Sequence, residues 1–133
     1  MHSTNYRNTL ITVSPDTSAD QARIPDRPGT IAALQYALLA NRSYEMTSDD
    51  LIFEVHTIRS GIDEAERQNA RNQFFSKGQA CLRSSPLVKQ FGWGIHHDDC
   101  GRIALVAIGS PEYEALLERS DVSVVSGMRS KRA

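Results

Sequence analysis

The order of apolar and polar positions along the chain predicts short strands and helices separated by turns. Residues 8–13 are apolar and β-branched and are followed by Ser14 and Pro15, which predicts a strand and then a turn. Residues 14–29 contain three prolines and several small polar residues, which is typical of a long loop. A final short strand is expected around residues 122–125.

The longest apolar run, residues 31–40, is interrupted by Gln35 and predicts a helix. Thr30 precedes the run and is a good N-cap, so the helix should extend from residue 31 to about residue 39. The helical period places Ile31, Leu34 and Leu38 on one side. We therefore expect these three side chains to be buried.

Capping signals predict further helices. Thr47 with Asp50 resembles a capping box and predicts a helix over residues 48–59 that ends at Gly61. The alternative is a strand over residues 51–58, because that segment is rich in β-branched residues.

Three more helix starts follow later in the chain. Asp63 with Glu66 predicts a helix that reaches about Lys77, with Ala70 and Phe74 as its buried ridge. Ser-Pro pairs at residues 85–86 and 110–111 predict two further helices, since serine is a good N-cap and proline fits the first helical position.

Residues 93–97 and 102–108 flank Asp98-Asp99-Cys100-Gly101 and predict a β-hairpin. If His97 pairs with Arg102, both faces of the hairpin are apolar, which predicts a homodimer that covers one of them. In total we expect an α+β fold in one domain, residues 1–133. Its small antiparallel sheet should have about four strands, accompanied by four or five helices.

The charge balance of the chain argues against some classes of partner. Lys plus Arg number 15 and Asp plus Glu 16, giving a net charge of −1. This argues against a nucleic-acid or membrane-surface binder, which should carry a basic excess. There is no secretory signal, so we expect a cytosolic protein in which Cys81 and Cys100 are free thiols.

Several motifs resemble those of a known family. They are FFSKGQACLRSSPL at residues 74–87, GWGIH at residues 92–96, NTLI at residues 8–11 and MRSKRA at residues 128–133. Together they resemble a family of small bacterial proteins of about this length that carries only a domain-of-unknown-function label. The resemblance covers essentially the whole chain and implies a bacterial cytosolic protein. It implies no reaction, so it assigns no role to any residue.

Two residues are candidates for catalysis. His96 lies next to Gly94 on the predicted strand, which would leave a gap where a ligand could approach an acid–base group. The alternative is a core histidine that bonds to the backbone, with Gly94 making room for a ring.

Cys81 precedes Arg83 and a helix start, both of which would favour a reactive thiolate, and a dyad with His96 is conceivable. The alternative is a small buried apolar side chain.

The remaining candidates concern ligand binding. Arg83 and Arg129 are the predicted anion-binding residues, with Trp93 and Glu54 completing the set. Lys131 and Arg132 are better explained as a solvated tail, and Trp93 has the alternative of a core position. The histidines and carboxylates lack metal-ligand spacing, so we expect no metal and no cofactor.

The leading hypothesis is a small cytosolic enzyme that acts on an anionic or polar small molecule, with His96 as the acid–base group. The alternatives are a non-catalytic module that binds a small ligand or a protein, and an oligomeric accessory protein. The ligand hypotheses place His96, Arg83 and Arg129 at one concave surface. His97 should lie on the opposite face, held as a charged pair by Asp98 and Asp99.

Overall fold

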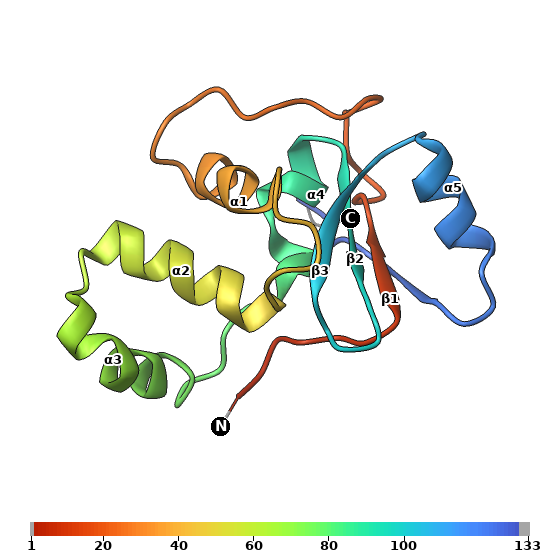
Figure 1. The fold of residues 1–133 in the computed structure, drawn as a ribbon. Coiled ribbons are helices and arrows are strands. Elements are labelled where there is room, and N and C mark those ends of the chain that lie inside the picture. Colours follow the sequence, from red (N-terminus) through yellow and green to blue (C-terminus); the bar gives the residue numbers. More distant parts are fainter. Residues whose placement is uncertain (1, 131–133) are drawn as a thin grey trace.

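The computed structural model describes residues 2–130, which fold around a four-stranded sheet of order β3-β2-β1-β4 (Figure 1). The strands are β1 (Thr9–Thr12), β2 (Trp93–His97), β3 (Ile103–Ala107) and β4 (Ser123–Ser126). β2 is antiparallel to both β1 and β3, whereas β4 is parallel to β1. The α+β class is confirmed, but the sheet is mixed rather than antiparallel. The parallel pair arises because a helix, α5 (Pro111–Glu118), connects β3 to β4 and returns the chain in the same direction.

The helix starts predicted at Thr30, Thr47, Ser85 and Ser110 are confirmed by their caps. Besides α5, the helices are α1 (Ile31–Leu39), α2 (Ser48–Ser60), α3 (Arg67–Phe74) and α4 (Pro86–Gln90). At α2 the side chains of Thr47 and Asp50 each accept a hydrogen bond from the other's backbone amide, and Gly61 ends the helix at φ +66°. This capping box decides residues 51–58 in favour of the helix.

The helix predicted from Asp63 to Lys77 is shorter than expected. A 3₁₀ turn (Glu64–Glu66) comes first, and α3 ends at Phe74. Ala70 and Phe74 are only half-buried, since α3 lies at the outer edge of the molecule and packs on α2 rather than on the sheet (Figure 1).

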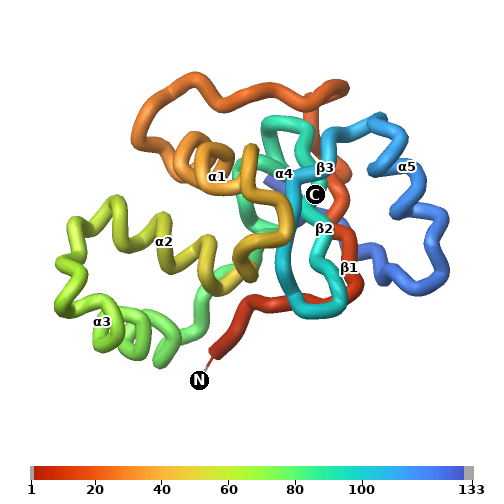
Figure 2. The backbone as a smooth tube through the Cα atoms, in the orientation of Figure 1, coloured from red at the N-terminus to blue at the C-terminus, as the bar shows by residue number. Residues whose placement is uncertain are grey.

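Each face of the sheet is covered by helices of the same chain (Figure 2). On one face, Ile11 and Ile95 pack against apolar side chains of α1, α2, α4 and the segment before α4, namely Leu39, Leu51, Leu82 and Val88. On the other face, Leu10 and Val106 pack against α5 through Tyr113 and Leu116. The unpaired apolar face that motivated the dimer prediction is therefore filled within one chain.

The predicted register of the hairpin is wrong by one residue. His97 lies opposite Ile103, not Arg102, because the turn closes one step earlier between Asp98 and Arg102. A one-residue shift exchanges the two faces of a strand, and the observed register buries Ile103 completely.

The side of α1 that faces the core also differs from the prediction. The buried residues are Ala32, Gln35 and Leu39, while Ile31 is 39% exposed. The helix is thus rotated so that the polar Gln35 points inward. The prediction of the buried side was wrong because the most apolar side of a helix is expected to face the core, and that side does not include Gln35.

The outer edge of β3 is covered by the loop between α1 and α2. The amide of Tyr44 donates to the Ile103 carbonyl at 2.8 Å, and the Ile103 amide donates to the Met46 carbonyl at 2.9 Å. Tyr44 adopts φ +61°, a left-handed conformation that is costly for tyrosine and is held here by its hydrogen bonds. In residues 2–130, no helix has the length and apolar character needed to cross a membrane.

Candidate functional site

His96 lies on the α5 face of the sheet and is closed off from solvent. It is 7% exposed, and its Nδ1 lies 2.8 Å from the hydroxyl oxygen of Tyr44. The space beside Gly94 is occupied by Tyr113: a Cβ on Gly94 would lie 2.8 Å from Cε2 of that ring. The expected gap next to His96 is therefore filled. Burial lowers the pKa of His96, so its neutral form is favoured.

His97 points to the opposite face, as predicted, but it is not paired with Asp98 or Asp99. Its side chain is completely buried, and neither ring nitrogen has a hydrogen-bond partner among the described residues. Burial lowers the pKa of His97 to about 4. The Asp98 carboxylate instead accepts hydrogen bonds from the amides of Cys100 and Arg102 and so shapes the hairpin turn.

Cys81 lies on the α1–α2 side of the sheet, whereas His96 faces α5. The sheet therefore lies between the two residues, and the structure does not bring them together as a dyad. The Cys81 sulfur lies 3.4 Å from the hydroxyl oxygen of Tyr6. Cys81 and Cys100 are both free thiols, as expected.

The predicted ligand-binding residues are dispersed. Nε of Arg83 donates to the Ser126 carbonyl at 2.6 Å and so covers the outer edge of β4. Glu54 forms an ion pair with Arg67, between α2 and α3.

The other two members of that set are also apart. Nε1 of Trp93 donates to the Arg23 carbonyl at 2.8 Å, and the Trp93 ring packs on Tyr36. Arg129 is exposed after β4. Lys131 and Arg132 lie outside the described residues.

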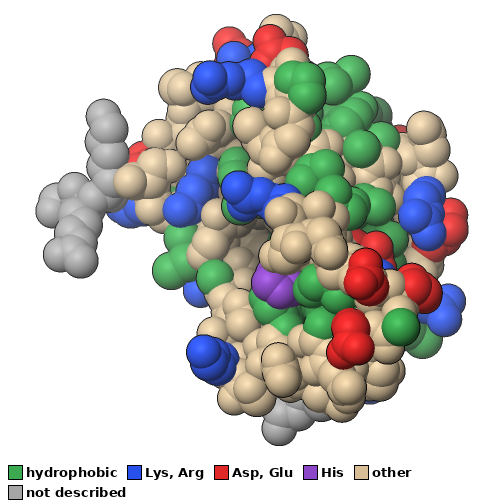
Figure 3. All heavy atoms as spheres, turned by 90° about the vertical axis from the view of Figure 1, so that its left-hand side faces the viewer, with side chains coloured by type: hydrophobic (Ala, Val, Ile, Leu, Met, Phe, Trp, Pro, Cys, Tyr) green, Lys and Arg blue, Asp and Glu red, His purple; other side chains and the backbone are tan. Residues whose placement is uncertain are grey.

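A cavity of about 620 Å³ lies instead between α1, α2 and the segment 80–86. This volume is within the usual range for small-molecule sites. Figure 3, which looks onto the side of α2 and α3, shows a hollow beside a histidine with basic side chains above it. The cavity has an apolar wall built from residues of all three segments: Ile31, Ile52, Val55, Ala80, Leu82 and Pro86.

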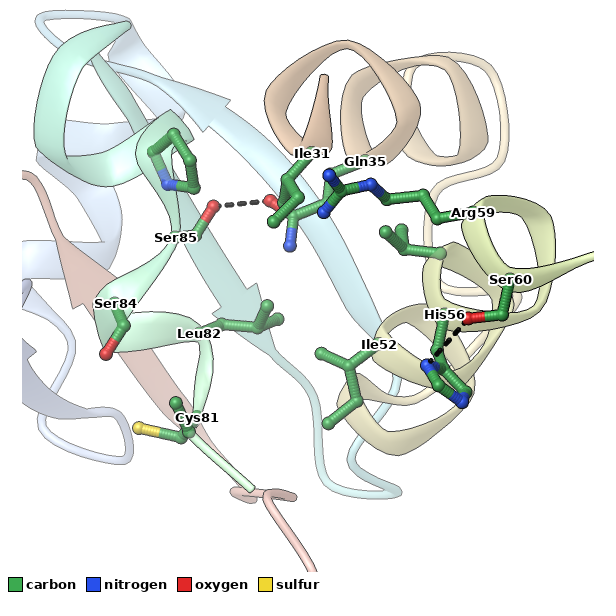
Figure 4. Close-up of a pocket in the computed structure, with 13 residues that line it drawn as sticks. Ile31, Gln35, Ile52, His56, Arg59, Ser60, Cys81, Leu82, Ser84 and Ser85 are labelled. Carbon is green, nitrogen blue, oxygen red and sulfur yellow. Dashed lines mark hydrogen bonds between the residues drawn. The ribbon is translucent and has the colours of Figure 1, made fainter. Parts of the chain in front are cut away.

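Gln35 supplies a buried polar group to this cavity. Gln35 is only 4% exposed, and its Oε1 accepts a hydrogen bond of 2.5 Å from the Ser85 hydroxyl. The Ser85 oxygen also accepts a hydrogen bond from the Leu87 amide as the N-cap of α4, and its hydroxyl proton remains available for Gln35. The amide nitrogen of Gln35 is thereby turned into the cavity, where it has no partner among the described residues (Figure 4).

Arg59 and His56 complete the polar part of the cavity. Arg59 extends from the last turn of α2 toward Gln35 (Figure 4), and no carboxylate among the described residues pairs with it. His56 stacks on Phe74 at 4.5 Å between ring centroids, and its Nδ1 lies 3.5 Å from the Ser60 hydroxyl. The cavity thus presents hydrogen-bond donors from Gln35 and Arg59.

Two neighbouring cavities differ in character. One of about 900 Å³ lies between α2 and α3, shares His56 and Ser60 with the first, and contains Asp63 and Glu66. The other, about 340 Å³, lies beside the loop before α1. Because α3 has no buried residue, the larger cavity lacks an apolar floor comparable to that of the first.

A further cluster lies at the tip of the hairpin, where ligand atoms of Asp98, Asp99 and Cys100 are within 4.8 Å of one another. Its geometry follows from the turn, because Asp98 already accepts two backbone hydrogen bonds. The expectation that the protein binds no metal stays a prediction.

Comparison with known proteins confirms the family resemblance. The chain matches the Family of unknown function (DUF6157) over residues 1–133 and belongs to it. No curated protein and no solved structure matches the chain.

Gln35, Arg59 and His56 were not predicted from the sequence as ligand-binding residues. The available signal was Gln35 itself, the polar residue that interrupts the apolar run of residues 31–40. The protein provides a partner for the oxygen of this amide and leaves its nitrogen to the cavity.

Proposed function

We propose that this protein is a small-molecule-binding module whose site is the cavity between α1, α2 and the segment 80–86. The observation that carries the proposal is the buried amide of Gln35, with its nitrogen directed into the cavity. This nitrogen has no hydrogen-bond partner among the described residues, so it is available to donate to an acceptor on a ligand in the cavity. The ligand therefore carries an oxygen acceptor and an apolar part.

The form of the cavity supports the same assignment. Small-molecule sites are mainly apolar with a few polar groups that orient the ligand. Here the apolar wall meets polar residues at its two ends, Ser85 with Gln35 at one and His56 with Ser60 at the other (Figure 4).

An enzymatic role for the same cavity is the second candidate. His56 gives it an imidazole, the side chain best suited to proton transfer near neutral pH. In this form of the hypothesis His56 takes the acid–base role that the sequence suggested for His96, and the substrate is still a small polar or anionic molecule.

The setting of this function follows from the sequence. We propose a bacterial, cytosolic protein: the motif resemblance supports the bacterial origin, and the two free thiols support the cytosolic location. A homodimer stays a prediction that sedimentation would test, and its original motive is weakened because both sheet faces are covered within the chain.

Blocking the cavity tests the proposal. The probe is 4-phenylbutyramide, which has a carbonyl acceptor and an apolar body, and its Kd is measured by NMR titration of ¹⁵N-labelled protein. Ala80 is an exposed residue that lines the cavity, so Ala80→Trp should weaken binding by about tenfold or more. Ala115→Trp places the same side chain on the exposed face of α5 and should leave Kd unchanged. Equal affinity in both variants would refute this site.

A further inference from the structure

We infer that the natural ligand of this cavity is a carboxylate with an apolar body, held at its head by Arg59 and the amide of Gln35. The inference rests on the proposed function and adds the charge of the ligand and the residue that selects it.

The first support is the charge balance of the cavity. The chain contains 16 Asp and Glu residues, yet none is among the described residues that line this cavity. Arg59 does line it, and it has no ion-pair partner within the described chain. Arg59 is exposed at the rim of the cavity, so its guanidinium has no competing carboxylate and is free to bind an anion that enters there.

The second support is the geometry of the donors. Figure 4 shows Arg59 extending from α2 toward Gln35 on α1, so the two side chains approach from different helices. A carboxylate has two oxygens in one plane: the guanidinium can bind either one or both, and the Gln35 amide can donate to one. A neutral amide or alcohol offers fewer acceptor positions and no charge.

The third support is the apolar wall that continues from these donors. Leu82 and Ile52 lie between the Gln35–Ser85 end and the His56–Ser60 end of the cavity (Figure 4). With a fully polar anion such as inorganic phosphate in the cavity, this apolar wall would remain exposed to water. An apolar body attached to the carboxylate would cover it.

The position of Arg59 also has a structural explanation that involves no ligand, and the test must distinguish the two. It lies in the last turn of α2, where a positive charge stabilises a helix by a few tenths of a kcal/mol. That role predicts a small change in stability on Arg59→Gln and no change in ligand preference. Ligand preference is therefore the readout that decides between the two.

The test compares 4-phenylbutyrate with its neutral analogue 4-phenylbutyramide in NMR titrations at low salt. In the wild type, the carboxylate should bind about fivefold more tightly than the amide, which is the upper range for a pair with an exposed arginine. In Arg59→Gln the two probes should bind within about twofold of each other, with the amide affinity little changed. Arg7→Gln removes another exposed arginine outside the cavity and should keep the wild-type preference.

The outcomes separate this inference from the proposed function. If the amide binds in the cavity but the carboxylate gains nothing, or if the preference survives in Arg59→Gln, the carboxylate assignment is wrong while the cavity remains the site. If neither probe binds to the wild type, the proposed function itself fails.

Discussion

The hydroxyl of Ser85 donates a 2.5 Å hydrogen bond to Oε1 of Gln35, and this bond fixes which polar atom of the glutamine faces the cavity. Ser85 also caps α4 through the Leu87 amide. One serine therefore both starts a helix and orients the amide that we assign to the ligand.

Ser85→Ala should lower the free energy of unfolding by about 2–3 kcal/mol, because it removes a helix cap and leaves the buried Gln35 oxygen without a donor. Ser110→Ala removes only the N-cap of α5, where Ser110 accepts from the Tyr113 amide, and should cost about 1 kcal/mol. Chemical denaturation measures both. Equal losses would show that the Ser85–Gln35 bond contributes little.

The buried His97 should make the protein acid-sensitive. Its pKa is about 4 in the folded protein, whereas the ordinary pKa of a histidine side chain is 6.5. Between these values the unfolded chain binds a proton that the folded chain does not, so the free energy of unfolding decreases as pH falls from about 6.5 to about 4. The loss from this residue is about 3 kcal/mol.

His97→Leu should remove that part of the pH dependence, while His2→Gln, at an exposed histidine, should not. The measurement is denaturant unfolding at several pH values between 7 and 4. A stability difference between His97→Leu and wild type that stays constant over this range would contradict a neutral, buried His97.

Gly94→Ala should destabilise the protein by about 1–3 kcal/mol, since the added methyl group would meet the Tyr113 ring at 2.8 Å and the Ile11 carbonyl at 3.0 Å. Gly78 has open space around its Cβ position, so Gly78→Ala should be tolerated. Thermal unfolding of the two variants checks this. A neutral Gly94→Ala would mean that the space beside His96 is open after all.

His96→Asn should lower the melting temperature and leave binding of 4-phenylbutyramide unchanged. The reason is that His96 holds the Tyr44 hydroxyl on the α5 face, away from the cavity. Tyr44→Phe should reproduce most of the loss. A His96→Asn protein that melts like the wild type but no longer binds the probe would restore His96 as the site residue.

Much of the fold could be predicted from short sequence motifs. Caps at Thr30, Thr47, Ser85 and Ser110 placed helix starts correctly, because a cap is satisfied by residues within one turn. The parallel pairing of β4 and the register of the hairpin were not accessible in this way. The register depends on which side chains the sheet buries, and the pairing depends on β4 joining β1, which is distant in sequence.

The site was harder to predict for the same reason. His96 and Gly94 suggested an opening, but Tyr113, which is distant in sequence, fills it. Gln35 was visible as a polar interruption, yet its role depends on Ser85, fifty positions later. Residues chosen for their chemistry alone, such as Arg83 and Glu54, turned out to have partners within the fold.

The most direct test of the cavity as a ligand site is the side-chain amide resonance of Gln35 in ¹H–¹⁵N spectra, assigned by its disappearance in Gln35→Met. We expect 4-phenylbutyramide to shift this resonance in a saturable manner, together with the backbone amide of Leu82. An unshifted Gln35 side chain at saturating probe, with the largest changes near His96 instead, would contradict the assignment of the site to this cavity.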